Sequence, residues 1–331
     1  MSDRSHNATV LLFAICMLKE NVSLKKYTTF QIGGVARYFW EAESATDIKL
    51  AIEWAARRGL PFFVLAGGSN LLVADKGFDG LAIKVKSAKC KVKSLGGDKA
   101  SLHCEAGVKL SELVAVSLKE GLSGLEWASG IPQATVGGAV WGNAGAFGEN
   151  MADVVSEAEV MEVQSAKCKV KSYQNEDCDF GYKDSIFKQD RNLVILSADF
   201  VLEKKNKQEV KEEVKKVLQY RKDHHPSQPS AGSIFKNEKL KMKNEKLFSQ
   251  HPELIIFQAK GEIPAGFLIE KCGLKGKKIG GAQISTKHTN FIVNTGTATA
   301  NEVKQLIDLA KQAVKDKFAI ALEEEIQYLG F

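Results

Sequence analysis

The segment from Ala128 to Gly148, ASGIPQATVGGAVWGNAGAFG, limits what this chain can fold into more than any other segment. It has six glycines and no Lys, Arg, Asp or Glu. It is therefore too rich in glycine for a helix interior and too apolar for an ordinary surface loop. Because glycine allows positive φ angles and close backbone approach, many N–H groups can point at one anion. The composition favours a diphosphate held by backbone amides rather than by lysines.

A second glycine loop follows a predicted helix and strand. Ser44–Arg58 is predicted to be a helix, with Ser44 as its N-cap and Gly59 at its end. Phe62–Leu65 is predicted to be a short buried strand, followed directly by Ala66–Leu72, AGGSNLL. A glycine turn after a strand is where α/β proteins bind phosphates and nucleotides. The loop matches neither a Walker sequence nor G-x-G-x-x-G, so an ordinary turn is the alternative.

Length and composition indicate a globular protein of two domains. The chain has 331 residues, and its 44% hydrophobic and 26% charged residues are ordinary globular values. The net charge of +6 is spread along the chain, which suits small anionic substrates and does not indicate nucleic-acid binding. Neither the cysteines nor the histidines have metal-ligand spacing, so no metal site is expected. We expect the cysteines to be reduced thiols in a cytoplasmic protein.

The N-terminal residues 8–18 form an apolar run that is too short to cross a bilayer. No small-residue cleavage site follows, so a secretion signal is disfavoured and no membrane association is expected. Met17 opens a more ordinary sequence, and a start codon at Met17 is the alternative to Met1. Residues 1–16 are therefore treated as a doubtful extension.

Residues 17–203 read as a mixed α and β domain. Apolar patterning predicts a helix at Leu110–Lys119 that ends at Gly121. Strands are predicted at Leu81–Val85, Leu102–Ala106, Glu157–Val163 and Leu193–Leu202. The octapeptide SAKCKVKS occurs twice, at Ser87–Ser94 and Ser165–Ser172, and its alternation predicts exposed strands.

Residues 204–331 read as a second domain that begins with a highly charged helix over 204–222. The polar segment Asn237–His251 is predicted to be a surface insertion, and Ala265–Cys272 to be a helix. Thr299 and Glu302 form a capping box for a helix through about Lys317. The final predicted strand, 320–329, alternates. Its apolar residues Ile320, Leu322, Ile326 and Tyr328 fall on one face, and Glu323 and Glu325 on the other.

Seven motifs occur in order along the chain. They are TTFQIGG (Thr28–Gly34), AGGSNLL (Ala66–Leu72), SGIPQATVGGAVWGNAGAFG (Ser129–Gly148), FGYKDSIFK (Phe180–Lys188), PSAGSIFKN (Pro229–Asn237), GLKGKKIGGAQIS (Gly273–Ser285) and LEEEI (Leu322–Ile326). Together they resemble the UDP-N-acetylenolpyruvoylglucosamine reductases, also called UDP-N-acetylmuramate dehydrogenases, in their shorter type II form. The resemblance extends from about Asn21 to the C-terminus.

The resemblance implies an α+β protein. Residues 17–203 would form an FAD-binding domain of the vanillyl-alcohol-oxidase or PCMH type, and residues 204–331 an α/β substrate-binding domain. It also implies that NADPH reduces a non-covalently bound FAD, which then reduces UDP-N-acetylglucosamine enolpyruvate to UDP-N-acetylmuramate. The expected partners are these small molecules, and the expected oligomeric state is a monomer.

The resemblance assigns three residues to catalysis. Ser233 would donate the proton, and a serine hydroxyl can do so only to a strongly basic intermediate at close range. Glu325 would polarise the substrate carboxylate, which calls for a buried and partly protonated carboxyl group. Lys183 stands where the family has arginine. Because lysine lacks the planar fork that binds a carboxylate at two points, we expect reduced turnover rather than an inactive protein.

The resemblance also assigns binding residues. The expected cofactor contacts are Gly67, Gly68, Ser69, Asn70, Leu71, Ser129, Gly130, Ile131, Thr135, Gly137, Gly138, Asn143, Ala144, Gly145 and Ala146. The expected substrate contacts are Tyr182, Arg221, Lys236, Asn237 and His288, with Arg221 facing the UDP diphosphate.

Two alternatives remain open at this stage. One is another flavin oxidoreductase of the same fold that acts on a different small substrate. The other is a catalytically impaired flavoprotein that binds UDP-sugars, with Lys183 marking the loss. The AGSIFKN and LEEEI motifs weigh against the first, and the presence of Ser233 and Glu325 weighs against the second.

Overall fold

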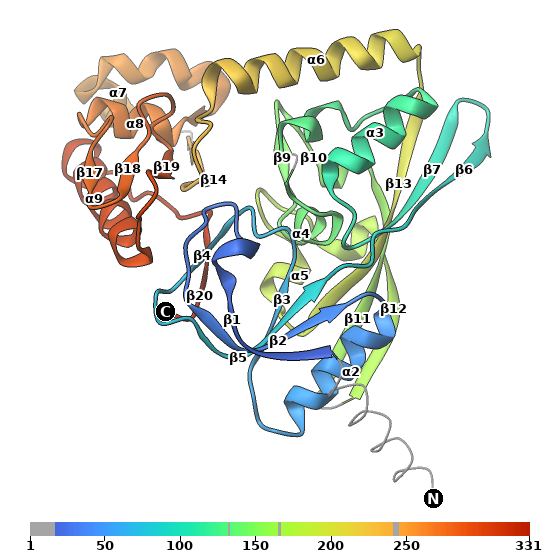
Figure 1. Ribbon diagram of the computed structural model, residues 1–331. Coiled ribbons are helices and arrows are strands. Elements are labelled where there is room, and N and C mark those ends of the chain that lie inside the picture. The colour runs from blue at the N-terminus through green and yellow to red at the C-terminus, as the bar shows by residue number, and fades with distance from the viewer. Residues whose placement is uncertain (1–16, 132, 165–166, 241–244) are drawn as a thin grey trace, which may run out of the picture. The chain divides into compact units, whose positions relative to one another are not determined.

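A computed structural model describes residues 17–131, 133–164, 167–240 and 245–331 (Figure 1). The doubtful extension at 1–16, the start of the second octapeptide and part of the predicted insertion lie outside the described residues. The chain forms two compact units. The first runs up to Val22 and includes Val35–Gly68 and Phe78–Arg221, whereas the second comprises Ser23–Gly34, Ser69–Gly77 and Lys222–Phe331.

This division differs from the expected boundary at 203/204, because helix α6 (Lys207–His224) belongs mostly to the first unit. Val214 of α6 is buried in the hydrophobic core of that unit. Conversely, Phe30 and Leu72, which were expected in the first domain, are fully buried in the core of the second. The second unit is thus built from three separate segments, which local sequence patterns do not reveal.

The first unit contains a small, largely parallel sheet. Its strand order is β1 (Leu18–Ser23), β2 (Val35–Ala42), β5 (Phe78–Val85) and β3 (Phe62–Leu65), and β5 runs parallel to both β2 and β3. Helix α2 (Ala45–Ala56) begins at Ser44, whose side chain accepts a 3.1 Å hydrogen bond from the Asp47 N–H. The predicted helix, its N-cap and the strand at Phe62–Leu65 are confirmed.

The first unit also contains a larger antiparallel sheet (Figure 1). Its order is β12 (Lys167–Gln174), β11 (Val155–Gln164), β13 (Leu193–Lys204), β7 (Lys99–Glu105) and β6 (Cys90–Gly96), with β8 (Leu122–Ser123) also paired to β13. Helix α3 (Leu110–Glu120) ends at Gly121, which has a φ of 69°. These elements confirm the predicted strands and helix.

The two octapeptides lie on opposite edges of this sheet, in β6 and β12, and most of their described residues are exposed. The prediction of exposed strands is therefore confirmed for that part of the repeat. The expectation of reduced thiols is wrong for Cys90 and Cys104, which form a disulfide. The pairing of β6 with β7 places these cysteines directly opposite each other, with Cα atoms 4.2 Å apart.

The glycine-rich segment is not a loop throughout. It runs from η2 (Glu126–Gly130) through a short helix, α4 (Val136–Trp141), to the hairpin of β9 (Gly145–Ala146) and β10 (Glu149–Asn150). The expectation that glycine would exclude a helix here is wrong. A Cβ atom at Gly137 would lie 2.8 Å from the Ala106 Cβ, so packing requires glycine inside this helix. The remaining short elements of the unit are η3 (Met151–Asp153), η4 (Asn175–Cys178) and α5 (Ile186–Gln189).

The second unit is built around a four-stranded antiparallel sheet. Its order is β14 (Ser230–Ser233), β19 (Phe291–Asn294), β18 (Ala282–Ile284) and β17 (Lys278–Ile279). Two further pairs join β15 (Glu238–Lys239) to β16 (Glu262–Ile263) and β4 (Leu71–Val73) to β20 (Gln327–Leu329). The helices are η1 (Leu24–Tyr27), α7 (Glu245–Gln250), η5 (Pro252–Lys260), α8 (Ala265–Lys271) and α9 (Ala300–Phe318). The capping box of α9 at Thr299 and Glu302 is confirmed.

Two predictions for the second unit need correction. The final strand is shorter than 320–329, because the N–H groups of Glu325 and Ile326 both point at the Ile234 carbonyl and a continuous ladder starts only at Gln327. The segment 237–251 is not a simple surface insertion, since Leu247 and Phe248 of α7 pack against the core.

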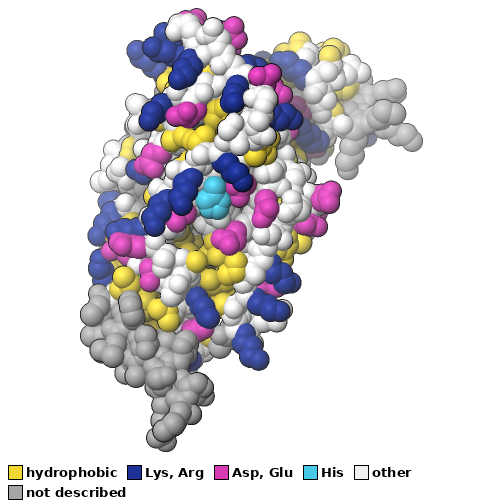
Figure 2. All heavy atoms as spheres, turned by 90° about the vertical axis from the view of Figure 1, so that its right-hand side faces the viewer, with side chains coloured by type: hydrophobic (Ala, Val, Ile, Leu, Met, Phe, Trp, Pro, Cys, Tyr) yellow, Lys and Arg dark blue, Asp and Glu magenta, His cyan; other side chains and the backbone are white. Residues whose placement is uncertain are grey.

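Charge is mixed on the face seen in Figure 2, where basic side chains are interspersed with acidic ones rather than gathered in one basic field. None of the described helices has the length and apolar character needed to span a bilayer.

Candidate functional site

Two glycine loops meet in the first unit. A Cβ atom at Gly67 would lie 2.3 Å from the Gln133 carbonyl oxygen, and one at Gly138 would lie 3.0 Å from the Ala66 Cβ. Only glycine allows both approaches, because a side-chain carbon at these distances would overlap its neighbour. The loop after β3 is therefore packed directly on the glycine-rich segment, as expected for two parts of one binding site.

Thr135 lies at this junction and carries an unsatisfied group. The residue is 4% exposed, and its Oγ1 atom has no hydrogen-bond partner in the described part of the chain. A buried hydroxyl without a partner costs free energy, so it fits a polar ligand that supplies one. Neither loop carries a charged side chain around this point. The junction therefore fits the diphosphate of FAD held by amides and a hydroxyl.

Two other predicted cofactor residues have side chains that bond to the protein itself. The Ser129 hydroxyl donates a 2.7 Å hydrogen bond to the Glu126 carbonyl. The Asn143 Nδ2 atom donates a 2.7 Å bond to the Gly181 carbonyl, and its Oδ1 accepts from the Ala152 N–H at 3.0 Å. These side chains hold the segment in shape.

Lys183 is held against the same segment. It lies in the turn between Gly181 and Asp184 with a φ of 57°, and its Nζ atom donates a 3.0 Å hydrogen bond to the Gly145 carbonyl. The Lys188 Nζ atom in turn bonds to the Lys183 carbonyl at 2.6 Å. The neighbouring predicted residue Tyr182 is 42% exposed. The structure therefore brings the predicted catalytic lysine onto the predicted cofactor segment.

Arg221 also lies on the glycine-rich segment, where its guanidinium donates a hydrogen bond to the Gly130 carbonyl. Burial lowers the pKa of this guanidinium. Beside it, the rings of Phe147 and Tyr220 stack edge to face, with centroids 5.2 Å apart. Arg221 is therefore positioned by the first unit.

The second unit brings Ser233 and Glu325 onto neighbouring backbone. Ser233 ends β14 after Gly232, whose φ of 76° suits glycine. The next residue, Ile234, accepts hydrogen bonds from the N–H groups of Glu325 at 2.8 Å and Ile326 at 3.3 Å. Glu325 is half-buried, whereas the expectation was a buried carboxyl. It directly follows Glu324, whose backbone forms an isolated bridge with Phe235.

The second half of the first glycine loop supports this pair. The loop is divided between the units after Gly68, so Ser69, Asn70 and Leu71 belong to the second. The Asn70 Nδ2 atom donates a 3.0 Å hydrogen bond to the Glu325 carbonyl, and the Asn70 carbonyl accepts from the Gln327 N–H at 3.0 Å. Asn70 therefore positions Glu325.

Asn290 is a positioning residue that sequence reasoning missed. It is 4% exposed, and its side chain bonds both the N–H (3.0 Å) and the carbonyl (2.9 Å) of Phe235. It thereby fixes the chain between Ser233 and Lys236. A polar residue directly before the apolar strand Phe291–Asn294 was the available signal.

The three remaining substrate residues differ in their surroundings. Lys236 forms an ion pair with Glu323, whereas the Asn237 side chain bonds to Glu262 at 3.0 Å and to the Ala265 N–H at 3.3 Å. The structure thus ties Asn237 to the start of α8. His288 is packed near Phe291, and burial lowers the pKa of its imidazole.

The LEEEI motif directs its three glutamates to different partners. Glu323 pairs with Lys236, and Glu324 with Lys311 at 2.7 Å and with the Tyr328 hydroxyl. Burial alone would raise the pKa of Glu324, but the bonds from Lys311 and Tyr328 together hold it below its usual value. Glu325 is the member whose backbone is tied to Asn70 and Ile234.

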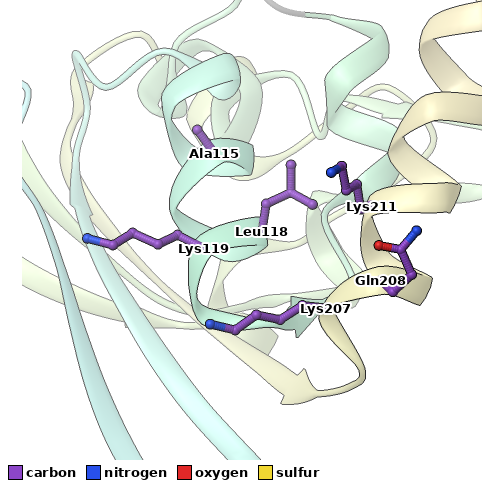
Figure 3. A pocket seen from close by; sticks show the side chains of 6 residues that line it. All are labelled: Ala115, Leu118, Lys119, Lys207, Gln208 and Lys211. Carbon is purple, nitrogen blue, oxygen red and sulfur yellow. The ribbon is translucent and has the colours of Figure 1, made fainter.

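A cavity of about 490 Å³ lies elsewhere in the first unit, between α3 and α6 (Figure 3). It is lined by Ala115, Leu118, Lys119, Lys207, Gln208 and Lys211, none of which is a predicted site residue. Figure 3 shows the three lysine amines spread apart rather than directed at one point. Within the described ranges, no group of His, Cys, Asp or Glu side chains could hold a metal ion.

Comparison with protein families divides the chain in two. Residues 36–167 match the family described as "FAD binding domain". Residues 224–329 match the family described as "UDP-N-acetylenolpyruvoylglucosamine reductase, C-terminal domain". These matches, with the mixed helices and strands described above, confirm the expected α+β fold class, an FAD-binding domain followed by a reductase C-terminal domain.

Relatives that align with nearly the whole chain indicate the same family. A UDP-N-acetylenolpyruvoylglucosamine reductase of Anoxybacillus flavithermus is 36% identical over 95% of this chain and 94% of its own length. One from Synechococcus sp. strain CC9605 is 38% identical over 94% of this chain and 95% of its own length. The crystal structure of the Thermus caldophilus reductase matches with a TM-score of 0.72 at 33% identity, covering 93% of this chain and 97% of the other. This chain belongs to the UDP-N-acetylenolpyruvoylglucosamine reductase family.

Proposed function

We propose that this chain reduces UDP-N-acetylglucosamine enolpyruvate to UDP-N-acetylmuramate, with NADPH as the electron donor, in peptidoglycan precursor synthesis. The reaction adds a hydride and a proton across the enolpyruvyl double bond, while NADPH becomes NADP⁺. FAD, when bound, accepts the hydride from NADPH and supplies it to the substrate.

The residues of the second unit suit the proton-transfer half of the reaction. Hydride addition leaves a carbanion whose charge spreads onto the neighbouring carboxylate. Ser233 then donates its hydroxyl proton to the adjacent carbon, a step that requires close positioning because serine is a weak acid. Glu325 polarises the substrate carboxylate. The hydrogen bonds of Asn290 and Asn70 support this assignment, since they fix the backbone at Phe235, close to Ser233, and at Glu325.

Lys183 suits stabilisation of the developing negative charge. Its bond to the Gly145 carbonyl fixes the amine beside the glycine-rich segment. A positioned cation stabilises a carbanion-like state because it needs little reorganisation as the charge forms. Tyr182, Arg221, Lys236, Asn237 and His288 are proposed to contact the substrate.

Gly67, Gly68, Thr135, Gly137 and Gly138 are proposed to hold the FAD diphosphate, together with the other cofactor residues assigned from the sequence. The support is the close approach of Gly67 to the Gln133 carbonyl and the unsatisfied hydroxyl of Thr135.

One observation carries the proposal most strongly: the Ile234 carbonyl, next to Ser233, binds the N–H of Glu325 at 2.8 Å. This bond supports the proposal because it joins the backbone beside Ser233 to that of Glu325, although the two residues are far apart in sequence. The test is an anaerobic assay of the purified protein. NADPH should bleach the flavin absorbance, and only the enolpyruvyl UDP-sugar should restore it rapidly.

Other results of the same assay separate the alternatives. Restoration by an unrelated small oxidant substrate would favour a different flavin oxidoreductase. Thermal stabilisation by the UDP-sugar without NADPH oxidation would indicate an impaired binding protein. We further propose that the protein is a cytoplasmic monomer, which cell fractionation and light scattering would test.

A further inference from the structure

Lys84 is a charged residue in an otherwise apolar strand. It lies in β5 between Ile83 and Val85, which are 0% and 4% exposed. Its amine donates a hydrogen bond to the carbonyl of Ala66, the residue before the Gly67-Gly68 turn. The pairing of β3 with β5 places Lys84 directly opposite Leu65, the residue before Ala66. Nothing in the proposed function uses this residue.

The charge of Lys84 is poorly compensated within the protein. In the part of the chain that the structure describes, no carboxylate lies within ion-pair distance of its amine. The nearby acid, Glu41, is already paired at 2.8 Å with Lys86 and at 2.7 Å with Lys19. A half-buried ammonium with three donors and only a backbone carbonyl as acceptor is unfavourable unless an anion completes its surroundings.

The groups around Lys84 also disfavour its charged form in the absence of an anion. Burial, together with the positive charges of Lys109 and Lys86, lowers the pKa of Lys84 to about 8, while Glu41 opposes the shift. The backbone of Lys109 pairs with Thr135, the residue with the unsatisfied buried hydroxyl. Lys84 is therefore next to the junction where the two glycine loops meet.

We infer that the Lys84 ammonium is the counter-ion of the FAD diphosphate and thus a further residue of the cofactor site. The inference rests on the proposed function in requiring that the chain binds FAD. The junction then combines amides, one hydroxyl and one ammonium. An anion bound there favours the charged form of Lys84, so FAD binding takes up a proton wherever the free protein has a neutral Lys84.

The sign of the pH effect follows from this linkage. Below a pH of about 8 the amine is already protonated, and the affinity for FAD is independent of its ionisation. Above that pH the dissociation constant of the wild type should rise, approaching about tenfold per pH unit.

The test is titration of the flavin-free protein with FAD between about pH 7 and about pH 9, with flavin fluorescence as the readout. Lys84→Met should weaken binding about 10- to 100-fold at neutral pH and abolish the pH dependence. Lys84→Arg should keep the affinity and also lose the pH dependence, because arginine stays charged. Lys86→Met is the matched control: it removes a lysine that directly follows β5 and pairs with Glu41. It should keep the wild-type slope but begin at a higher pH, because Lys86 lowers the pKa of Lys84.

The results of these titrations decide whether Lys84 is the counter-ion of the diphosphate. Wild-type affinity in Lys84→Met at neutral pH would overturn it, as would a slope that persists in Lys84→Met. If Lys84→Met fails to fold by circular dichroism, the wild-type and Lys84→Arg profiles still decide. Failure of the wild type to bind FAD at any pH would instead overturn the proposed function.

Discussion

The Nζ atom of Lys183 lies 3.0 Å from the Gly145 carbonyl oxygen and donates a hydrogen bond to it. Lys183 has a left-handed backbone with a φ of 57°, which the Lys188 amine supports through the Lys183 carbonyl. The amine is therefore held at the glycine-rich segment by the turn that carries it, even though the side chain is long and flexible.

Lys183→Arg should raise the rate at which the enolpyruvyl substrate reoxidises reduced flavin, because the guanidinium can bind a carboxylate at two points. Lys183→Ala should lower that rate about 100- to 1,000-fold by removing a charge-stabilising group. Anaerobic stopped-flow absorbance measures both. Lys171→Ala, which removes a lysine from an exposed edge strand, should leave the rate unchanged. An unchanged or slower Lys183→Arg enzyme would show that lysine is already well accommodated.

Ser233→Ala should separate the two half-reactions. Reduction of the flavin by NADPH needs no proton from Ser233 and should be unaffected. Reoxidation by substrate should slow about 100- to 10,000-fold, the usual contribution of a positioned general acid. Ser230→Ala, at the other end of the same strand, is the matched control. Equal slowing of both half-reactions would argue for a structural role of Ser233 instead.

Gly67→Ala should disrupt the loop junction, because the new Cβ atom would lie 2.3 Å from the Gln133 carbonyl oxygen. We expect loss of bound FAD and a destabilisation of about 1–3 kcal/mol from overpacking. Flavin absorbance and thermal denaturation report the two effects. The control is Gly142→Ala, whose nearest neighbour would be 3.6 Å away and which should behave like the wild type. Retention of FAD by Gly67→Ala would contradict the assignment of this junction.

Glu324 should make the second unit sensitive to acid. Its pKa is lowered in the folded protein, so its contribution to stability is complete above the ordinary value of about 4.5 and is lost as the pH falls through the folded value. Glu324→Gln should lower the free energy of unfolding at neutral pH by about 1.5–3 kcal/mol. The reason is that Lys311 and Tyr328 would then donate to a neutral amide instead of a charged carboxylate.

Denaturant titrations at neutral and acidic pH would measure this effect. The difference between wild type and Glu324→Gln should shrink as the pH falls. Lys304 lies 3.7 Å from Glu324 and pairs at 2.7 Å with the more exposed Asp308, so Asp308→Asn is a suitable control. A constant difference across the pH range would show that charge at Glu324 does not stabilise the fold.

Patterns that depend on neighbouring residues were predictable from the sequence. The N-cap at Ser44, the αL end of α3 at Gly121 and the capping box at Thr299 all follow from side chains within a few residues of each other. The two glycine loops were also predicted to belong to one binding site, and their close packing agrees with that prediction. The same reasoning wrongly excluded a helix at Val136–Trp141, where the requirement for glycine comes from contact with Ala106.

Lys84 and Asn290 show where sequence reasoning stops. Each is a single polar residue in or beside an apolar strand, and such a residue can equally well point to solvent. Their roles depend on a carbonyl or a peptide group that is distant in sequence, at Ala66 and Phe235 respectively.

The order and chemistry of the motifs were enough to establish the kind of protein and to predict the residues that would act, since local composition and spacing carry that information. Tertiary structure alone decided that Ser69–Gly77 and Ser23–Gly34 join the C-terminal unit, that Gly67 packs on Gln133, and that Glu325 is tied to Asn70 and Ile234. The physical reason is that these relationships are contacts between distant segments. They arise only when separate apolar surfaces are buried together, and that burial is a property of the whole chain rather than of any one stretch of it.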